Sequence, residues 1–415
     1  MKKTFSLLFA ALALLAAGCS SDEPAPGTEP TPDAPVKFEL TEAESRAAAA
    51  TQGFNLDFFQ AVCQHAPADE NVTTSPLSAS ILLSMFANAC DDTHRSQIAS
   101  ALGCRDIDAL NSLASKYLLA LPLVDESVDM TLANSVWYHN KYSLNPDFAS
   151  IVDKYYAGDK YDRNLQTGDP AIVSEINKWV SDKTSELIKE IVTAKDLNAQ
   201  TIAIMANAIY FKGQWANPFE PENTAEKEFK GATATSVVDM MFNGGMQHYA
   251  EAESFRAIKM EFGKGAFEAV LVLPNENTDL NALIASDELS SLSKLRYEDT
   301  PVNFHLPRLK LSPEKISLNV PLATLGISDL GQLNKYVIFT TPVEAMSKIF
   351  QKATIEFTEE GAEGAGVTWT GLELAPGPDA PATTKPEMNF NRPFAFFINE
   401  ATTGACLFAT RVCNL

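Results

Sequence analysis

The sequence has few basic residues. It holds 32 Lys and Arg against 53 Asp and Glu, a formal net charge of −21, and no basic run. This composition argues against nucleic acid or anionic lipid as a partner, because both bind clustered positive charge. Only five His occur, without metal-ligand spacing, and the G-x-S-x-G, H-E-x-x-H and C-x-x-C motifs are missing. We therefore expect no enzyme, no cofactor and no bound metal.

Cysteine is also scarce. Beyond Cys19 the chain has an odd number, which argues against a complete disulfide framework in an exported protein. Cys406 and Cys413 fall on one predicted strand, roughly 23 Å apart, whereas a disulfide spans at most about 7 Å. A bond from Cys63 to Cys90 or Cys104 is compatible with the sequence but not indicated by it. We otherwise expect these thiols to be buried as small apolar side chains.

The N-terminus has the pattern of a targeting segment. Met1-Lys-Lys precedes an apolar run, Thr4 to Ala17, that is too short to span a bilayer. It ends in Leu15-Ala-Ala-Gly-Cys19, which resembles a bacterial lipobox, so Cys19 is the expected lipidation site; a plain secretory signal is the alternative. Ser20-Ser-Asp-Glu23 is similar to acidic tags of lipoproteins exported to the bacterial surface. We expect an outer-membrane anchor through the lipid alone, with the protein exposed at the surface.

Composition divides the chain into three parts. Residues 1–18 form the predicted signal peptide, and residues 19–38 form a tether rich in proline and acids that cannot bury a core. Residues 39–415 have ordinary globular composition without repeats or an interior linker. The order of helices first and strands later, without strict alternation, indicates an α+β fold. Helices are predicted at 43–65, 76–90, 93–102, 116–122 and 171–190; strands at 131–139, 201–211, 257–261, 268–273, 302–311 and 353–358, with a hairpin at 394–399 and 405–412.

The segment from Lys348 to Arg392 looks able to change its secondary structure. After the predicted strand 353–358, the even positions from Ala362 onward are all small, and bulky or charged residues fall on odd positions. Strand side chains alternate between faces, so this segment could enter a sheet with its small face toward the core. An ordinary flexible loop is the alternative. The small positions are Ala362, Gly364, Gly366, Thr368 and Thr370.

Several segments of residues 39–415 can be read together as motifs. The most specific is Asn207-Ala-Ile-Tyr-Phe-Lys-Gly-Gln-Trp215, followed by Pro218-Phe219 and Thr224. The others are Asn71-Val-Thr-Thr-Ser-Pro-Leu-Ser78, Asn177-Lys-Trp-Val-Ser-Asp-Lys-Thr184, Leu306-Pro307, Leu325-Gly326-Ile327, Glu359-Glu-Gly361, Asn391-Arg-Pro-Phe394 and Arg411-Val-Cys-Asn414. Together they resemble the serpin superfamily and keep that family's order. The resemblance implies an α+β serpin fold with about nine helices, three β-sheets and an exposed reactive-centre loop.

The resemblance also implies a mechanism. A target protease attacks the exposed loop and forms an acyl-enzyme, and the cleaved loop then inserts into the central sheet and distorts the protease. The loop's hinge carries over to Glu359, Glu360, Gly361, Ala362, Gly364 and Gly366. Alanine at 362 is compatible with inhibition. Gly364 and Gly366 depart from the commoner alanines and would slow insertion, because glycine adds entropy to the free loop.

The resemblance further implies a cluster that controls opening of the sheet. The polar residues beneath the opening carry over to Ser75, Ser78 and Asn207, and Trp215 matches the tryptophan where insertion begins. The family often has histidine ten residues before the hinge glycine, where this chain has Gln351. Gln351 can still donate and accept, but pH dependence from that histidine is lost. Ordinary fold stability is the alternative role for these residues.

The scissile bond is ambiguous. Counting fourteen residues from Gly361 gives Ala375-Pro376, whereas counting back from Pro393 gives about Ala382, so the far side of the loop is about seven residues longer than usual. Because proline after the cut disfavours most serine proteases, Leu374-Ala375 is the preferred bond. Residues 359–384 contain no Arg or Lys, so we expect elastase-, chymotrypsin- or subtilisin-like targets, with papain-type cysteine proteases as a further class.

We therefore expect a monomeric protease inhibitor that works as a suicide substrate. A non-inhibitory serpin acting as a surface binding module is the alternative, motivated by the hinge glycines and the long proline-rich loop. Formation of a protease complex that survives boiling in detergent discriminates between the two.

Overall fold

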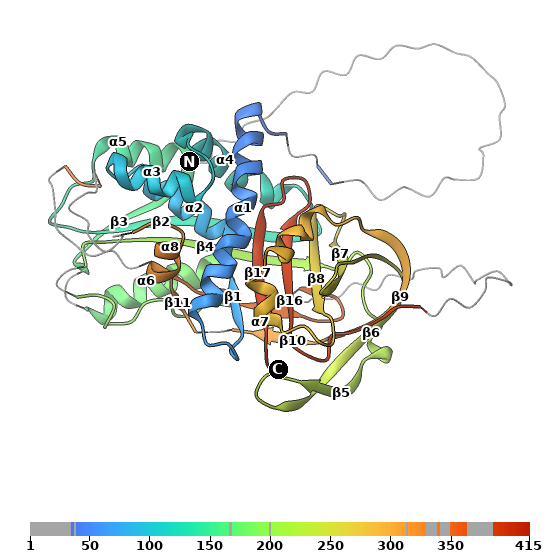
Figure 1. Cartoon of the computed structure of the whole chain (residues 1–415). Coiled ribbons are helices and arrows are strands. Elements are labelled where there is room, and N and C mark those ends of the chain that lie inside the picture. The colour runs from blue at the N-terminus through green and yellow to red at the C-terminus, as the bar shows by residue number, and fades with distance from the viewer. Residues whose placement is uncertain are drawn as a thin grey trace, which may run out of the picture. The chain divides into compact units, whose positions relative to one another are not determined.

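The computed structural model describes residues 35–36, 39–165, 168–198, 201–312, 314–328, 338–340, 349–362 and 385–415. Figure 1 shows α1 with a group of helices on one side and the strands β17, β16 and β8 on the other. The described helices are α1 (Glu42–His65), α2 (Pro76–Ala87), α3 (Asp92–Ala101), α4 (Ile107–Ala120), α5 (Pro146–Ile151), α6 (Pro170–Lys183), α7 (Leu280–Ile284) and α8 (Asn319–Thr324), with the short η1 (Leu121–Leu123), η2 (Val152–Tyr156), η4 (Pro221–Asn223) and η5 (Asp287–Lys294).

The strands that the structure describes form three sheets. The described strands are β1 (Val72–Thr74), β2 (Val128–His139), β3 (Asp159–Arg163), β4 (Ala203–Gln214), β5 (Ala225–Lys230), β6 (Thr235–Glu251), β7 (Phe255–Phe262), β8 (Phe267–Pro274), β9 (Glu298–Pro307), β10 (Leu309–Leu311), β11 (Ile316–Ser317), β12 (Phe350–Gln351), β13 (Ile355–Phe357), β14 (Gly361–Ala362), β15 (Glu387–Asn389), β16 (Phe394–Glu400) and β17 (Cys406–Val412). The central sheet has the order β10-β13-β14-β4-β2-β3. A nine-stranded sheet runs β1-β17-β16-β8-β7-β6-β9-β15, with β5 beside β6, and β11 pairs with β12.

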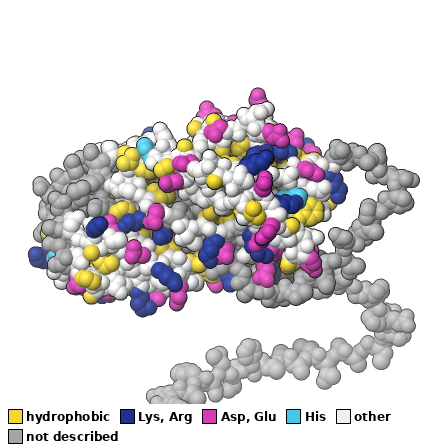
Figure 2. Space-filling view, turned by 90° about the horizontal axis from the view of Figure 1, so that it is seen from below, with side chains coloured by type: hydrophobic (Ala, Val, Ile, Leu, Met, Phe, Trp, Pro, Cys, Tyr) yellow, Lys and Arg dark blue, Asp and Glu magenta, His cyan; other side chains and the backbone are white. Residues whose placement is uncertain are grey.

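Helix starts follow local chemistry. Thr41 caps α1 in a capping box with Glu44, and Ser75 caps α2, with Pro76 in its first turn. One large apolar core joins the helices to both large sheets. A second core beneath α6 packs Ile176 and Trp179 of that helix near Trp137 and Ala206 of the central sheet. Over the face drawn in Figure 2, acidic and basic side chains are interspersed.

The α+β order predicted from sequence is confirmed, but several boundaries were wrong. Helix α6 ends at Lys183 instead of residue 190, because Ser185 and Glu186 adopt left-handed backbone angles (φ 47° and 66°). The Asn177 side chain then accepts hydrogen bonds from the backbone of Ile191 (2.9 Å) and Val192 (3.0 Å).

Three further boundaries differ from the predictions. Helix α4 begins at Ile107, nine residues earlier than predicted, because Asp106 caps it. Helix α2 ends at Ala87, where the Asn88 side chain donates to the carbonyl of Ser84 (2.8 Å). The strand predicted at 302–311 divides into β9 and β10 at Arg308, whose backbone N–H donates to the carbonyl of Asp239 (2.8 Å).

The cysteines beyond Cys19 are free thiols, so the bond from Cys63 to Cys90 or Cys104 that the sequence left open is not formed in the structure. Four of the five are buried, and Cys104 is half-buried. Burial raises the pKa of the Cys63 thiol to about 12, which keeps it protonated and unreactive at neutral pH.

Candidate functional site: the loop hinge and the sheet opening

The hinge lies inside the central sheet. After β13 the chain turns at Thr358–Glu360, and β14 returns as a two-residue strand between β13 and β4. Gly361 pairs with Gln214 and Ala362 with Gly213. Ala362 is only 1% exposed, so the small side chain at the first even position faces the core, as the alternation predicts.

Glycine is required at position 361 by close approach of the backbones. A Cβ atom there would lie 2.1 Å from the carbonyl oxygen of Gly213 and 2.7 Å from Cα of Gln214. Both contacts are with backbone atoms of β4, which cannot move without breaking the sheet. The hinge can therefore enter between β13 and β4 only because residue 361 has no side chain.

Glu359 is buried and held by a cation. Arg308 donates to both carboxylate oxygens, from Nε (2.8 Å) and Nη2 (2.7 Å), and the Thr224 hydroxyl donates to Oε1 (2.6 Å). Burial acts to raise the pKa of Glu359, but the hydrogen bonds from Arg308 and Thr224 outweigh it, so the pKa lies below its ordinary value. Arg308 also bonds Asp239 (2.9 Å). This forked ion pair fixes the start of the loop against the sheet.

Trp215 holds the same turn from the other side. Its backbone N–H donates to the carbonyl of Glu360 (2.8 Å), and its indole Nε1 donates to the carbonyl of Thr358 (3.0 Å). The ring is buried and stacks on Phe262, with ring centroids 4.4 Å apart. Trp215 thus contacts the turn that leads into β14, at the end of the sheet where the resemblance places the start of insertion.

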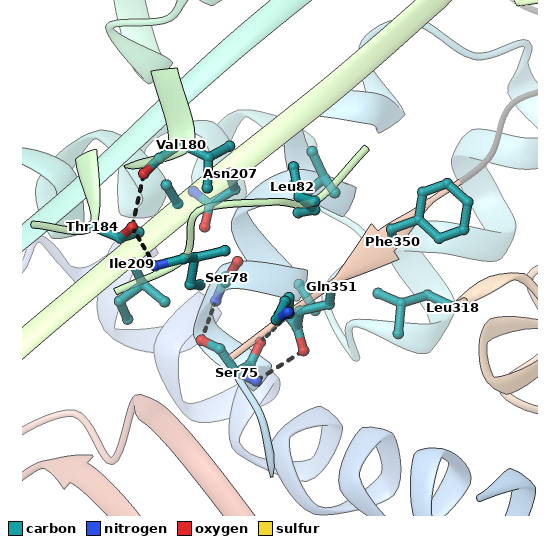
Figure 3. Close-up of a pocket in the computed structure, with 15 residues that line it drawn as sticks. Ser75, Ser78, Leu82, Val180, Thr184, Asn207, Ile209, Leu318, Phe350 and Gln351 are labelled. Atoms are coloured by element: carbon teal, nitrogen blue, oxygen red, sulfur yellow. Dashed lines mark hydrogen bonds between the residues drawn. The ribbon is translucent and has the colours of Figure 1, made fainter. Parts of the chain in front are cut away.

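A small cavity of about 20 Å³ lies between the central sheet, α2 and α6 (Figure 3). Gln351 ties β12 to the start of α2 at one end of it: its Oε1 accepts from the backbone N–H of Ser75 (2.9 Å), and its Nε2 donates to the Ser75 carbonyl (2.9 Å). The Thr74 hydroxyl also donates to Oε1. Ser78 contributes its backbone N–H, which donates to the Ser75 hydroxyl (3.2 Å). Glutamine therefore donates and accepts here, as its chemistry predicts.

Asn207 lines the same cavity but belongs to a separate group. Its Nδ2 donates to Oδ1 of Asn134 (2.8 Å) on the neighbouring strand β2, away from Ser75 and Gln351. Its Oδ1 is buried and has no hydrogen-bond partner among the described residues. A buried acceptor without a donor costs about 1–3 kcal/mol. The predicted polar cluster is thus divided into two groups, one around Gln351 and Ser75 and one around Asn207. In the second group, Oδ1 of Asn207 has no donor among the described residues.

One edge of β4 is largely unpaired within the described residues. On its β2 side, residues 203–213 pair continuously. On its β13 side, only Gly213 and Gln214 pair, with β14. Polar groups of an unpaired strand edge can bond an added strand. The central sheet therefore combines a started strand, an open edge beyond it and a cavity beneath.

The described residues contain no group of three or more His, Cys, Asp or Glu that could hold a metal ion. The 20 Å³ cavity is comparable to one water molecule, too small for an organic substrate. In the part of the chain that the structure describes, no helix has the length and apolarity to cross a bilayer.

Sequence reasoning missed the partners of the hinge. Arg308 is separated from Glu359 by 51 residues, and nothing in its sequence context indicates that it faces an acid. Asn134 on β2 and Thr184 after α6 were likewise not assigned to the opening, although Thr184 lies within a matched motif. Several predicted site residues lie outside the described residues: Cys19, Gly364, Gly366, Leu374, Ala375 and Pro376.

The fold and the hinge together define a class of protein: a mixed α+β domain whose central sheet accepts the first residues of its own loop as an additional strand.

Comparison with known proteins identifies the family. The family model described as "Serpin (serine protease inhibitor)" matches residues 49–415, so the chain belongs to the serpin family, and the predicted serpin fold is confirmed.

Individual relatives agree with this assignment. A "Serine protease inhibitor" from Cyanea capillata is 29% identical over 360 residues, covering 84% of this chain and 93% of its own length. The crystal structure of tengpin, a thermophilic serpin, in its native state matches with a TM-score of 0.79 and 27% identity, over 92% of this chain and 97% of that chain. Serpin48 from the insect Tenebrio molitor shares the fold, with a TM-score of 0.80 and 23% identity over 91% of this chain and 100% of its own.

Proposed function

We propose that this serpin inhibits serine proteases by acting as a suicide substrate whose cleaved loop inserts between β13 and β4. The observation that carries the proposal is β14: Gly361 and Ala362 already occupy the position of an inserted strand. Beyond that point no described strand pairs with β4 on the β13 side. An added strand satisfies the backbone groups of this edge, and its ladder bonds stabilise the product by about 0.5–1.5 kcal/mol each.

The register of β14 determines what an inserted loop would meet. Ala362 pairs with Gly213, so a strand continued without a bulge would place Gly364 opposite Phe211 and Gly366 opposite Ile209. Opposite residues of antiparallel strands point to the same face. Phe211 and Ile209 are buried, so only small side chains fit beside them. The small even positions of the loop thus agree with the register of the hinge.

The same register would bring Thr368 opposite Asn207. A threonine hydroxyl can donate to the buried Oδ1 of Asn207, which has no partner among the described residues. Loop insertion would thereby satisfy an acceptor that costs free energy before cleavage. In the inserted state Oδ1 of Asn207 would then have a donor, which it lacks among the residues that the structure describes.

The chemistry begins as ordinary proteolysis. The serine oxygen of the protease would bond to the carbonyl carbon of Leu374, the peptide bond to Ala375 would break, and the new amino group of Ala375 would take the proton. Water would normally release the acyl group. Insertion must displace the attached protease before that step, so inhibition is a race between insertion and deacylation.

Pancreatic elastase tests this proposal. We expect a complex that survives boiling in detergent, and a released C-terminal peptide that begins within residues 373–383. A start outside that range removes the assignment of the reactive bond. Cleavage without any stable complex would instead support the alternative, a non-inhibitory serpin that serves as a surface binding module.

We further propose that Cys19 carries lipid and anchors the domain to the outer membrane, facing the exterior. The Leu15-Ala-Ala-Gly-Cys19 pattern and the acidic residues after it support this localisation. Labelled palmitate should be incorporated into the wild type and not into Cys19→Ala. Protease added to intact cells should digest the wild-type protein if it faces outward.

A further inference from the structure

The outer face of β6 and β9 is uncharged in its middle, although 20% of the residues of this chain are charged. Six residues lie on this face in three opposed pairs, and none is an acid or a Lys or Arg. We call them the β6–β9 face: Phe242 opposite His305, Gly244 opposite Asn303, and Met246 opposite Pro301.

Alternation along both strands separates this face from the core. Met241, Leu306 and Phe304 are buried on the inner side, whereas Met246 is 62% exposed and Pro301 is exposed on the outer side. Phe242 is half-buried, and its ring lies 4.9 Å from that of His305. An exposed methionine beside an exposed proline is an apolar surface that folding leaves uncovered.

Charged groups occur only around this face. At one end Nδ1 of His248 lies 2.7 Å from a carboxylate oxygen of Asp299, and at the other Lys227 contacts Nε2 of His305 (2.7 Å). Glu387 of β15 lies along the side, opposite Asn303. An uncharged centre with Met and an aromatic ring, surrounded by polar and charged groups, is the composition of a protein–protein interface.

The reactive loop joins the body at this face. Strand β15, which follows the loop, pairs in parallel with β9, and the backbone N–H of Asn303 donates to the carbonyl of Pro386 (3.0 Å). Leu374 and Pro386 are twelve residues apart, at most about 40 Å of extended chain. A protease domain of about 230 residues has a radius of gyration near 17 Å. A protease bound at Leu374 is therefore within reach of the β6–β9 face.

We propose that the β6–β9 face is a docking surface for the body of the target protease, which would present an uncharged, apolar-tipped surface loop beside its active-site cleft. This inference rests on the proposed function, because the loop determines which protein comes near. Docking there would raise the rate of association without changing loop insertion. Met246 is then a residue that determines specificity.

The test compares Met246→Glu with Val320→Glu in the full chain. Val320 on α8 is 57% exposed, so the control introduces the same charge at a similarly exposed apolar side chain outside this face. With pancreatic elastase we expect Met246→Glu to lower the rate constant of loop attack about tenfold, because a charge would enter an uncharged contact. Val320→Glu should match the wild type, and both variants should keep the wild-type Tm and the wild-type number of inhibitor molecules consumed per protease.

Equal rates for Met246→Glu and the wild type would overturn the docking surface, as would an equal loss in Val320→Glu. The rate of loop attack is measurable whether the protease is trapped or merely cleaves the loop. A wild type that is cleaved without forming a complex would therefore refute the inhibitory function while still allowing the docking surface to be tested.

Discussion

Thr368→Val should destabilise the cleaved form of this serpin and leave the uncleaved form unchanged. The register of β14 places residue 368 of an inserted loop opposite Asn207, whose Oδ1 is buried and has no partner among the described residues. Valine has nearly the same shape as threonine but no hydroxyl. Its substitution would remove one hydrogen bond to a buried acceptor, so we expect the cleaved form to lose about 1–3 kcal/mol.

Guanidinium unfolding measures this difference. Wild type and variant are each unfolded before and after cleavage of the loop by elastase, and the transition midpoints are compared. Thr370→Val is the matched control, because the same register would place residue 370 opposite Met205, which offers no carboxylate or amide acceptor. Only the cleaved form of Thr368→Val should unfold at lower denaturant.

Asn207→Ala provides a second check on the same pair. In the cleaved form, Thr368→Val should cost little once Asn207 is alanine, because the two side chains act as one contact. Equal losses from Thr368→Val and Thr370→Val, or a full loss from Thr368→Val in the Asn207→Ala background, would show that the inserted loop does not continue the register of β14.

Three further predictions concern the hinge and its supports. Ala362→Arg should abolish the proposed inhibition, because residue 362 is buried between β13 and β4; elastase should still cleave the loop but leave no detergent-stable complex. Arg308→Met should lower the free energy of unfolding of the uncleaved form by roughly 1.5–3 kcal/mol. The pKa of Glu359 is lowered in the folded state, so the stability difference between wild type and Arg308→Met should be at its full size above about pH 4.3. The difference should disappear as the pH falls through the folded pKa of Glu359. Gln351→His should make stability depend on pH near 6.5, since a protonated imidazole can no longer accept from the Ser75 N–H, and thermal melts between pH 5 and 8 would detect the loss at low pH.

The first residues of the predicted hinge are marked in the sequence by local features. Gly361 and Ala362 follow two acids, and the run of small even positions begins at Ala362, which the structure buries. The start of α2 was predictable for the same reason, since Ser75 and Pro76 form a helix start by themselves. Both depend on chemistry within a few residues.

The contacts that support the hinge were not predictable, because they join distant parts of the chain. Arg308 gives no local sign that it faces Glu359. The division of the polar cluster also depends on distant packing: Gln351 contacts Ser75, whereas Asn207 turns toward Asn134 on β2. The end of α6 was predicted wrongly because Ser185 and Glu186 adopt left-handed backbone angles; the Asn177 side chain then accepts a hydrogen bond from the distant backbone N–H of Ile191.

A pre-formed β14 would offset the flexibility of the loop glycines. Ordering one residue costs about 1–2 kcal/mol of backbone entropy, and glycine costs the most, so Gly364 and Gly366 should slow insertion. The register is already set at Gly361 and Ala362, however, so the free end would add residues to an existing strand without searching for its partner. Glu359 and Trp215 hold the turn before it in place. The proposed inhibition requires that loop insertion be faster than deacylation of the protease. Fixing Gly361 and Ala362 in the sheet before cleavage would therefore shorten insertion, the step that Gly364 and Gly366 prolong.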